Sequence, residues 1–135
     1  MTQGKKLAYG FEQQIEGSFE QAVEKVTAAL KVEGFGVLTT IDVGDTLKKK
    51  LAVDFRRYVI LGACNPALAH KALSAEPQVG LLLPCNIVVQ EGLAGGIIVS
   101  VQDTAAMFSV VDNPALKGIA DEVGQRLQRV MSSLR

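Results

Sequence analysis

Two Cys-Asn dipeptides are the parts of this chain that could carry chemistry together. Cys64-Asn65 ends one apolar segment, and Cys85-Asn86 begins another further along the chain. A cysteine thiolate is both a nucleophile and a metal ligand, and an asparagine amide can donate hydrogen bonds to an oxyanion or a carboxylate. The four residues therefore predict a site for a small anion, a sulfur species or a metal ion.

Cys64 lies between a predicted strand and a predicted helix. Asn65-Pro66 is a strong helix start, because asparagine is a preferred N-cap residue and proline at the first helical position loses no hydrogen bond. The N–H groups and the dipole at such a helix start favour a thiolate nearby, and Gly62 leaves the approach uncrowded. The alternative is that Cys64 and Cys85 are inert packing residues, because free cysteine is among the most buried residue types.

Cooperation between the two thiols depends on how their strands are connected. Antiparallel neighbours would bring Cys64 and Cys85 to the same edge of the sheet, whereas a parallel crossover would place them at opposite ends. The short connections favour the antiparallel arrangement. We then expect the two Cα atoms within roughly 10 Å, close enough to share a ligand without necessarily forming a disulfide.

The remaining chemical residues give weaker signals. Asn65 has a sufficient role as a helix cap, so Asn86 is the better candidate for a ligand donor. His70 is the one histidine, and a Cys-His dyad would need it to fold back on Cys64, whereas its neighbour Lys71 indicates a solvated position. Two cysteines and one histidine fall short of the four ligands of a structural zinc site, although a site shared between subunits could supply more. The sequence therefore names no set of metal ligands and no cofactor, and no glycine-rich phosphate loop is found.

Periodicity and turn residues predict alternating helices and strands. The N-terminal half has strands over 7–15, 36–41 and 55–61, a helix from the Ser18 cap to Gly34, and a short helix capped by Asp45 or Thr46. The third strand is apolar at three successive residues, which predicts cover on both faces. The C-terminal half has a helix opened by Asn65-Pro66, strands over 87–89 and 97–101 joined by a hairpin turn, and a last helix opened by Asn113-Pro114. This order predicts an α+β fold with a curved, mostly antiparallel sheet and helices packed on one face.

Composition sets the broad class. The 135 residues are 48% hydrophobic and 21% charged with zero formal net charge, which indicates a single globular domain over 1–135 with a flexible N-terminus over 1–6. The balanced charge argues against nucleic-acid binding. No segment is predicted to be a signal peptide or to span a membrane, and two cysteines form no disulfide framework. The sequence therefore predicts a cytoplasmic protein.

The segment from Tyr58 to Pro66, followed by Leu83-Pro84-Cys85-Asn86, resembles the pattern of the domain of unknown function 302 family. The resemblance runs from about Phe11 to the final helix. It implies a fold similar to the TATA-binding-protein-like α+β fold, a bacterial or archaeal origin and a homodimer. It supplies no enzyme activity.

Three hypotheses follow for the function. The first is a homodimeric binding domain whose small ligand lies against Gly62, Cys64, Asn65, Cys85 and Asn86. The second is a redox or sulfur-transfer enzyme in which Cys64 is the nucleophile and Cys85 the resolving thiol. The third is a structural or interaction module with inert cysteines.

Overall fold

The computed structural model describes residues 4–135 of the chain. The elements in chain order are β1 (Lys5–Lys6), β2 (Gly10–Ile15), α1 (Phe19–Val32), β3 (Gly36–Asp42), α2 (Val43–Leu51), β4 (Tyr58–Cys64), α3 (Pro66–Ala75), the 3-10 helix η1 (Pro77–Leu82), β5 (Cys85–Glu91), β6 (Ile97–Gln102), α4 (Thr104–Phe108) and α5 (Ala115–Ser133). The strands form a six-stranded sheet in the order β1-β2-β6-β5-β4-β3, and every neighbouring pair is antiparallel. The predicted α+β fold with an antiparallel sheet is confirmed.

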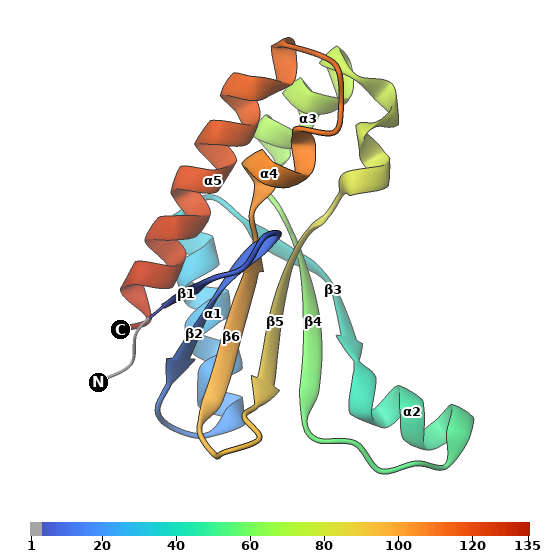
Figure 1. Cartoon of the computed structure of the whole chain (residues 1–135), viewed down its shortest axis with the longest axis vertical. Coiled ribbons are helices and arrows are strands. Elements are labelled where there is room, and N and C mark those ends of the chain that lie inside the picture. Colours follow the sequence, from blue (N-terminus) through green and yellow to red (C-terminus); the bar gives the residue numbers. More distant parts are fainter. Residues whose placement is uncertain (1–3) are drawn as a thin grey trace.

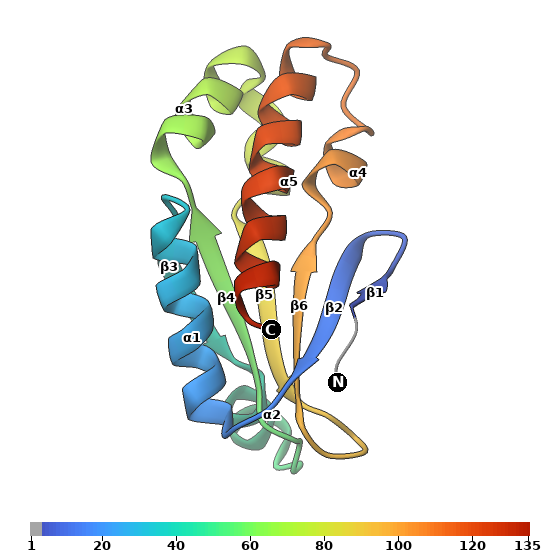
Figure 2. The same ribbon diagram turned by 90° about the vertical axis from the view of Figure 1, so that its left-hand side faces the viewer.

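The main hydrophobic core lies between the sheet and two helices. Figures 1 and 2 show α1 and the C-terminal part of α5 side by side against one face of the sheet. The helices contribute Phe19, Val26 and Leu30 from α1 and Leu127 and Val130 from α5, all buried. Alternate residues of the central strands point at them, as the two-residue period of a strand requires: Leu61, Ile87, Val89 and Val99 are at most 2% exposed.

A second, smaller core cluster lies beyond the end of the sheet. Its buried members are Ala72 from α3, Val79 from η1, Phe108 from α4, and Leu116 and Ala120 from α5. The N-terminal part of α5 packs there with α3 and α4, so this helix belongs to both clusters (Figure 1). The boundary between the two clusters is the end of the sheet at which β4 stops and β5 starts.

Local cap signals were predicted correctly in two of the helices. The Ser18 hydroxyl accepts a hydrogen bond from the Gln21 N–H at 3.1 Å, and the Ser18 N–H donates to the Gln21 Oε1 at 3.0 Å, so the capping box is complete. Asn65 caps α3 with Pro66 in its first turn. The short helix α2 is different: its N-cap is Asp42, not Asp45 or Thr46, so the helix begins directly where β3 ends.

Other boundaries differ from the prediction as well. The third predicted strand begins at Tyr58 rather than Phe55 and continues through Cys64. Its predicted cover on both faces is wrong, because α1 and α5 cover one face and Ile60 on the other stays half-buried. Neither η1 nor α4 was predicted. The flexible N-terminus expected over 1–6 lies partly outside the described residues, and Lys5–Lys6 within it form a strand with β2.

The segment from Gly36 to Phe55, which we call the β3–α2 arm, forms one edge of the fold (Figure 1). Most of β3 is exposed, and α2 has no buried residue at all. Exposed apolar side chains gather in this arm: Leu38, Ile41, Leu51, Val53 and Phe55. No helix in residues 4–135 has the length and apolar character needed to cross a membrane.

Candidate functional site

A cavity of about 360 Å³ lies at the boundary between the two core clusters. The end of the sheet, helix α3, η1, α4 and the middle of α5 all contribute to its wall. The residues that line it are Phe35, Leu38, Thr39, Ala63, Cys64, Asn65, Leu68, Ala69, Ala72, Leu73, Gly80, Leu83, Pro84, Cys85, Thr104, Phe108, Ile119 and Val123. Both cysteines and Asn65 of the predicted site are therefore in one cavity.

The strand register explains how the two cysteines meet. Ala63 of β4 pairs directly with Cys85 of antiparallel β5, and Cys64 is the next residue of β4. Directly opposed Cα atoms lie about 4.5–5.5 Å apart and consecutive ones about 3.8 Å. The Cα atoms of Cys64 and Cys85 are thus within the roughly 10 Å that the sequence predicted, at the same edge of the sheet. Both thiols are free.

The two thiols differ in their surroundings. Cys64 is partly exposed, whereas Cys85 is only 5% exposed. Burial raises the pKa of the Cys85 thiol to about 11, the nearby Thr104 hydroxyl opposes this in part, and the proximity of Cys64 adds to it. Cys85 is therefore a neutral thiol at pH 7, because its charged form would lie in a poorly solvated place.

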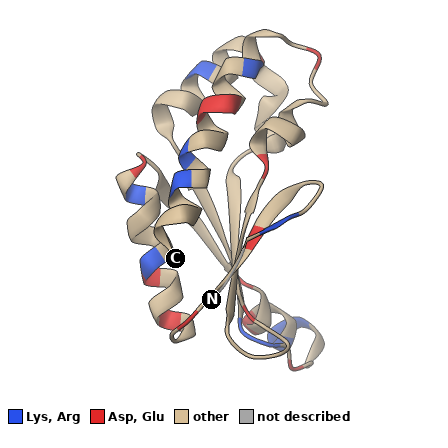
Figure 3. Ribbon diagram, turned by 60° about the vertical axis from the view of Figure 1, so that its left-hand side comes forward, with Lys and Arg blue, Asp and Glu red and all other residues tan. Residues whose placement is uncertain are grey.

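The cavity has an apolar wall. None of its lining residues is charged, and Lys, Arg, Asp and Glu lie elsewhere, many of them on α1, α2 and α5 (Figure 3). Its floor is buried, with Thr104 and Ala63 at 0% exposure and Phe108 at 5%. Its mouth is open, because Leu73 is 41% exposed and Leu38 67% exposed. The shape and lining are those of a site for a small molecule that is mainly apolar.

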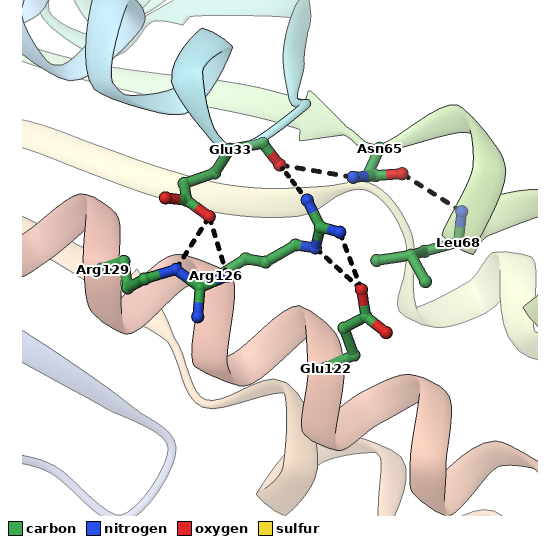
Figure 4. Close-up of polar contacts among 6 residues, drawn as sticks. All are labelled: Glu33, Asn65, Leu68, Glu122, Arg126 and Arg129. Carbon is green, nitrogen blue, oxygen red and sulfur yellow. Dashed lines mark hydrogen bonds and ion pairs between the residues drawn. The ribbon is translucent and has the colours of Figure 1, made fainter.

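Asn65 lines the cavity, but both ends of its amide are engaged by the protein (Figure 4). Its Oδ1 accepts a hydrogen bond from the Leu68 N–H at 3.2 Å, and its Nδ2 donates to the Glu33 carbonyl at 3.4 Å. The Arg126 guanidinium donates to the same carbonyl at 2.9 Å. Asn65 therefore connects the end of α1 to the start of α3, and the Glu33 carbonyl connects both to α5 through Arg126. This structural role agrees with the helix cap predicted from the sequence.

We expect Asn65→Ala to lower the free energy of unfolding by about 0.5–2 kcal/mol, the usual cost of a lost N-cap. Asn65→Asp is the comparison variant, because a carboxylate keeps the acceptor for Leu68 and replaces the donor to Glu33 with a charged oxygen. Urea unfolding of the three proteins measures the effect. Equal stability of wild type and Asn65→Ala would contradict the cap.

Asn86 and Gly62 lie apart from the cavity wall. They pair with each other across β4 and β5, one residue along from the Ala63–Cys85 pair, so the Asn86 side chain points to the face opposite that of Cys85, and neither residue is part of the cavity wall. Asn86 is exposed and lines a different, smaller hollow beside Gln102 and Tyr9. A Cβ at Gly62 would come within 2.2 Å of the Thr39 Oγ1, so this glycine allows close packing between β3 and β4.

The other residues considered from the sequence are outside the cavity. His70 is exposed on α3 and is not part of the cavity wall, so it forms no dyad with Cys64 there. Among residues 4–135, no group of three or more His, Cys, Asp or Glu side chains is arranged to hold a metal ion.

Thr104 is the site residue that sequence reasoning missed. It follows the end of β6, directly after the α4 N-cap Asp103, and no motif marks it. Leu73 gave a clearer signal: the helical period predicts that it is buried, yet it is 41% exposed because it lies at the cavity mouth.

Comparison with known proteins shows that the chain is similar to one protein family in both sequence and structure. The family model described as "Domain of unknown function DUF302" matches residues 11–134. The crystal structure of an uncharacterized conserved protein DUF302 from Bacillus stearothermophilus superposes with a TM-score of 0.86 at 31% sequence identity, covering 93% of this chain and 98% of that one. No curated protein matches the chain.

Proposed function

The chain belongs to the DUF302 family, whose name assigns no activity, and from its geometry we propose that it binds a small, uncharged, mainly apolar molecule. The observation that carries the proposal is the cavity of about 360 Å³ between the two core clusters, lined by Cys64, Cys85 and apolar side chains. Protein interiors are close-packed, so an apolar pocket of this size leaves its lining side chains without the partner atoms that they have elsewhere in the core. A ligand that fills it regains those contacts.

The lining of the cavity fits some of the ligands expected from the sequence (a small anion, a sulfur species or a metal ion) better than others. An anion would find no lysine or arginine in the wall, and a bound metal ion would find a neutral thiol at Cys85. A neutral molecule, including a neutral sulfur species, loses little on entering such a site. We therefore place the uncharged ligand first.

The thiol enzyme with Cys64 as nucleophile and Cys85 as resolving thiol remains the second hypothesis. It draws support from the partial exposure of Cys64 at the cavity. The raised pKa of Cys85, about 11, counts against it, because exchange requires the thiolate. Two free thiols fit the reducing cytoplasm expected from the sequence.

Benzene is a suitable first probe, because it has the size and polarity of ligands that enter dry apolar cavities. We expect benzene to shift the amide resonances of residues around the cavity in a saturable titration. Ala69→Phe, which fills the cavity from α3, should weaken binding at least about tenfold. Ala67→Phe, on the exposed side of the same helix, should leave it unchanged. Absence of saturable shifts in the wild type would overturn the proposed function.

We also propose that the chain forms a homodimer through the β3–α2 arm. The two edges of the sheet differ: β1 is short and carries Lys5 and Lys6, which discourage pairing, whereas β3 spans Gly36–Asp42 without a positive charge. If β3 paired antiparallel with β3 of a second copy about a two-fold axis, the unpaired backbone N–H and C=O groups of both β3 strands would form hydrogen bonds. The exposed Leu51, Val53 and Phe55 beside it would then be covered.

The dimer is expected to bury more than about 1,200 Å² in total. Light scattering at micromolar concentration should give twice the mass of the 14.4 kDa chain. Leu51→Glu combined with Phe55→Glu should shift the mass toward the monomer, because each would bury a charge in the interface. Leu93→Glu, in the turn between β5 and β6, is the control that should leave it unchanged. A monomer mass for the wild type would refute the proposal.

A further inference from the structure

The floor of the cavity contains a polar group without a partner. Thr104 is 0% exposed and lines the cavity, and its hydroxyl makes no hydrogen bond of ordinary geometry within residues 4–135. The Cys85 thiol lies near enough for the Thr104 hydroxyl to lower its pKa, but a neutral thiol is only a weak acceptor for that hydroxyl. A buried hydroxyl with no partner is costly, so its presence at this place needs an explanation.

The two ends of the cavity differ, because Thr104 lies at the buried floor and the mouth is exposed. The wall passes from buried residues around Thr104 and Phe108 to the exposed side chains of Leu38 and Leu73. Between these ends the lining is almost entirely apolar. A molecule that filled the space would therefore meet the buried Thr104 hydroxyl at the floor and a mainly apolar wall beyond it, with the Thr39 hydroxyl on the exposed side.

Building on the proposed binding function, we infer that the ligand carries one uncharged oxygen acceptor, such as a carbonyl or hydroxyl oxygen, and binds with that oxygen at Thr104. Its apolar body points toward Leu38 and Leu73. The Thr104 O–H donates to the ligand oxygen, which satisfies the orphan hydroxyl. The class of ligand is then a small ketone, aldehyde or alcohol rather than a hydrocarbon or an acid.

The surroundings of the hydroxyl oppose a charged head group. No cationic side chain lines the cavity to neutralise a carboxylate at the floor. The same poor solvation that raises the pKa of Cys85 to about 11 would act on a ligand carboxylate placed beside it. A neutral oxygen avoids that cost and still accepts the hydrogen bond.

The test compares cyclohexanone, cyclohexane and cyclohexanecarboxylate on the full chain, by the same resonance titration as for benzene. Thr104→Val replaces the hydroxyl with a methyl group of similar shape, and Thr104→Ser keeps the hydroxyl. We expect Thr104→Val to weaken cyclohexanone binding about threefold to tenfold, the effect of one lost hydrogen bond. Cyclohexane affinity should stay within about twofold of the wild type, and Thr104→Ser should retain cyclohexanone binding.

The unliganded proteins give an independent readout. Thr104→Val should melt at the same temperature as the wild type or higher, because it removes a buried hydroxyl that has no partner. A lower melting temperature would show that the hydroxyl has a partner inside the protein, and would overturn the inference. So would equal effects of Thr104→Val on cyclohexanone and cyclohexane, or tighter binding of the carboxylate. If neither neutral probe binds the wild type, the proposed function itself fails.

Discussion

Cys64 should react with iodoacetamide at pH 7 at least about 100-fold faster than Cys85 in the folded protein, because two effects act in the same direction. Cys85 is 5% exposed, and its pKa of about 11 leaves only about one thiolate in ten thousand at that pH. Cys64 is partly exposed at the cavity. The rates are measured by mass spectrometry on Cys85→Ala and Cys64→Ala, each of which keeps one thiol.

The same two variants in urea supply the control, because both thiols are then solvated and should react at similar rates. Similar rates in the folded proteins would contradict the assignment of Cys85 as a buried neutral thiol. An unusually fast Cys64 would favour the thiol enzyme, whereas two slow thiols would favour a structural module with inert cysteines. The binding proposal expects Cys64 to react at an intermediate rate and Cys85 not to react measurably in the folded protein.

Stability should fall as the pH rises from 9 to 11, and Cys85 should account for about 2–3 kcal/mol of the fall. Its pKa is raised from 9.0 to about 11 by burial in the folded protein. Between these values the unfolded chain has lost a proton that the folded chain retains. The contribution is therefore complete below pH 9 and is lost as the pH passes 11.

Urea unfolding at pH 8, 9.5 and 10.5 under reducing conditions measures this dependence. Cys85→Ala should show a shallower fall than the wild type, because it lacks the buried thiol. Cys64→Ala is the matched control and should keep nearly the whole fall, because burial is the largest cause of the shift at Cys85 and the proximity of Cys64 a smaller one. Parallel pH curves for wild type and Cys85→Ala would contradict the buried neutral thiol.

Features set by a few neighbouring residues could be predicted from the sequence. The Ser18 capping box and the Asn65-Pro66 helix start depend on groups within four residues of each other, and both were correct. The start of α2 at Asp42 was missed because strand residues run into the helix without a turn signal. The 3-10 helix η1, which begins at Pro77, was missed because proline and glycine in this segment are typical of a turn after a helix.

In the candidate site too, the features that depend on local sequence or strand pairing were predicted, and those that depend on tertiary packing were not. The shared edge of Cys64 and Cys85 followed from antiparallel pairing and was predicted. Asn86 was grouped with the thiols because it adjoins Cys85 in sequence, but successive strand residues point to opposite faces, and β5 already includes Cys85. Thr104 reaches the cavity only through the tertiary packing of α4 on α5, which no local pattern records.

The pairing of β2 with β6 has a consequence for how the protein is made. Gly10 and Ile15 lie opposite Gln102 and Ile97, so the N-terminal strand leaves the ribosome long before its partner exists. The apolar face of α1 likewise cannot be fully buried until β5, β6 and α5 have been synthesised. Strands β3 to β6 follow one another in the sheet and can pair as they emerge. The core, which includes Leu134, closes only after α5 and Leu134 have been synthesised, so a chain truncated within α5 should remain open to proteases and chaperones.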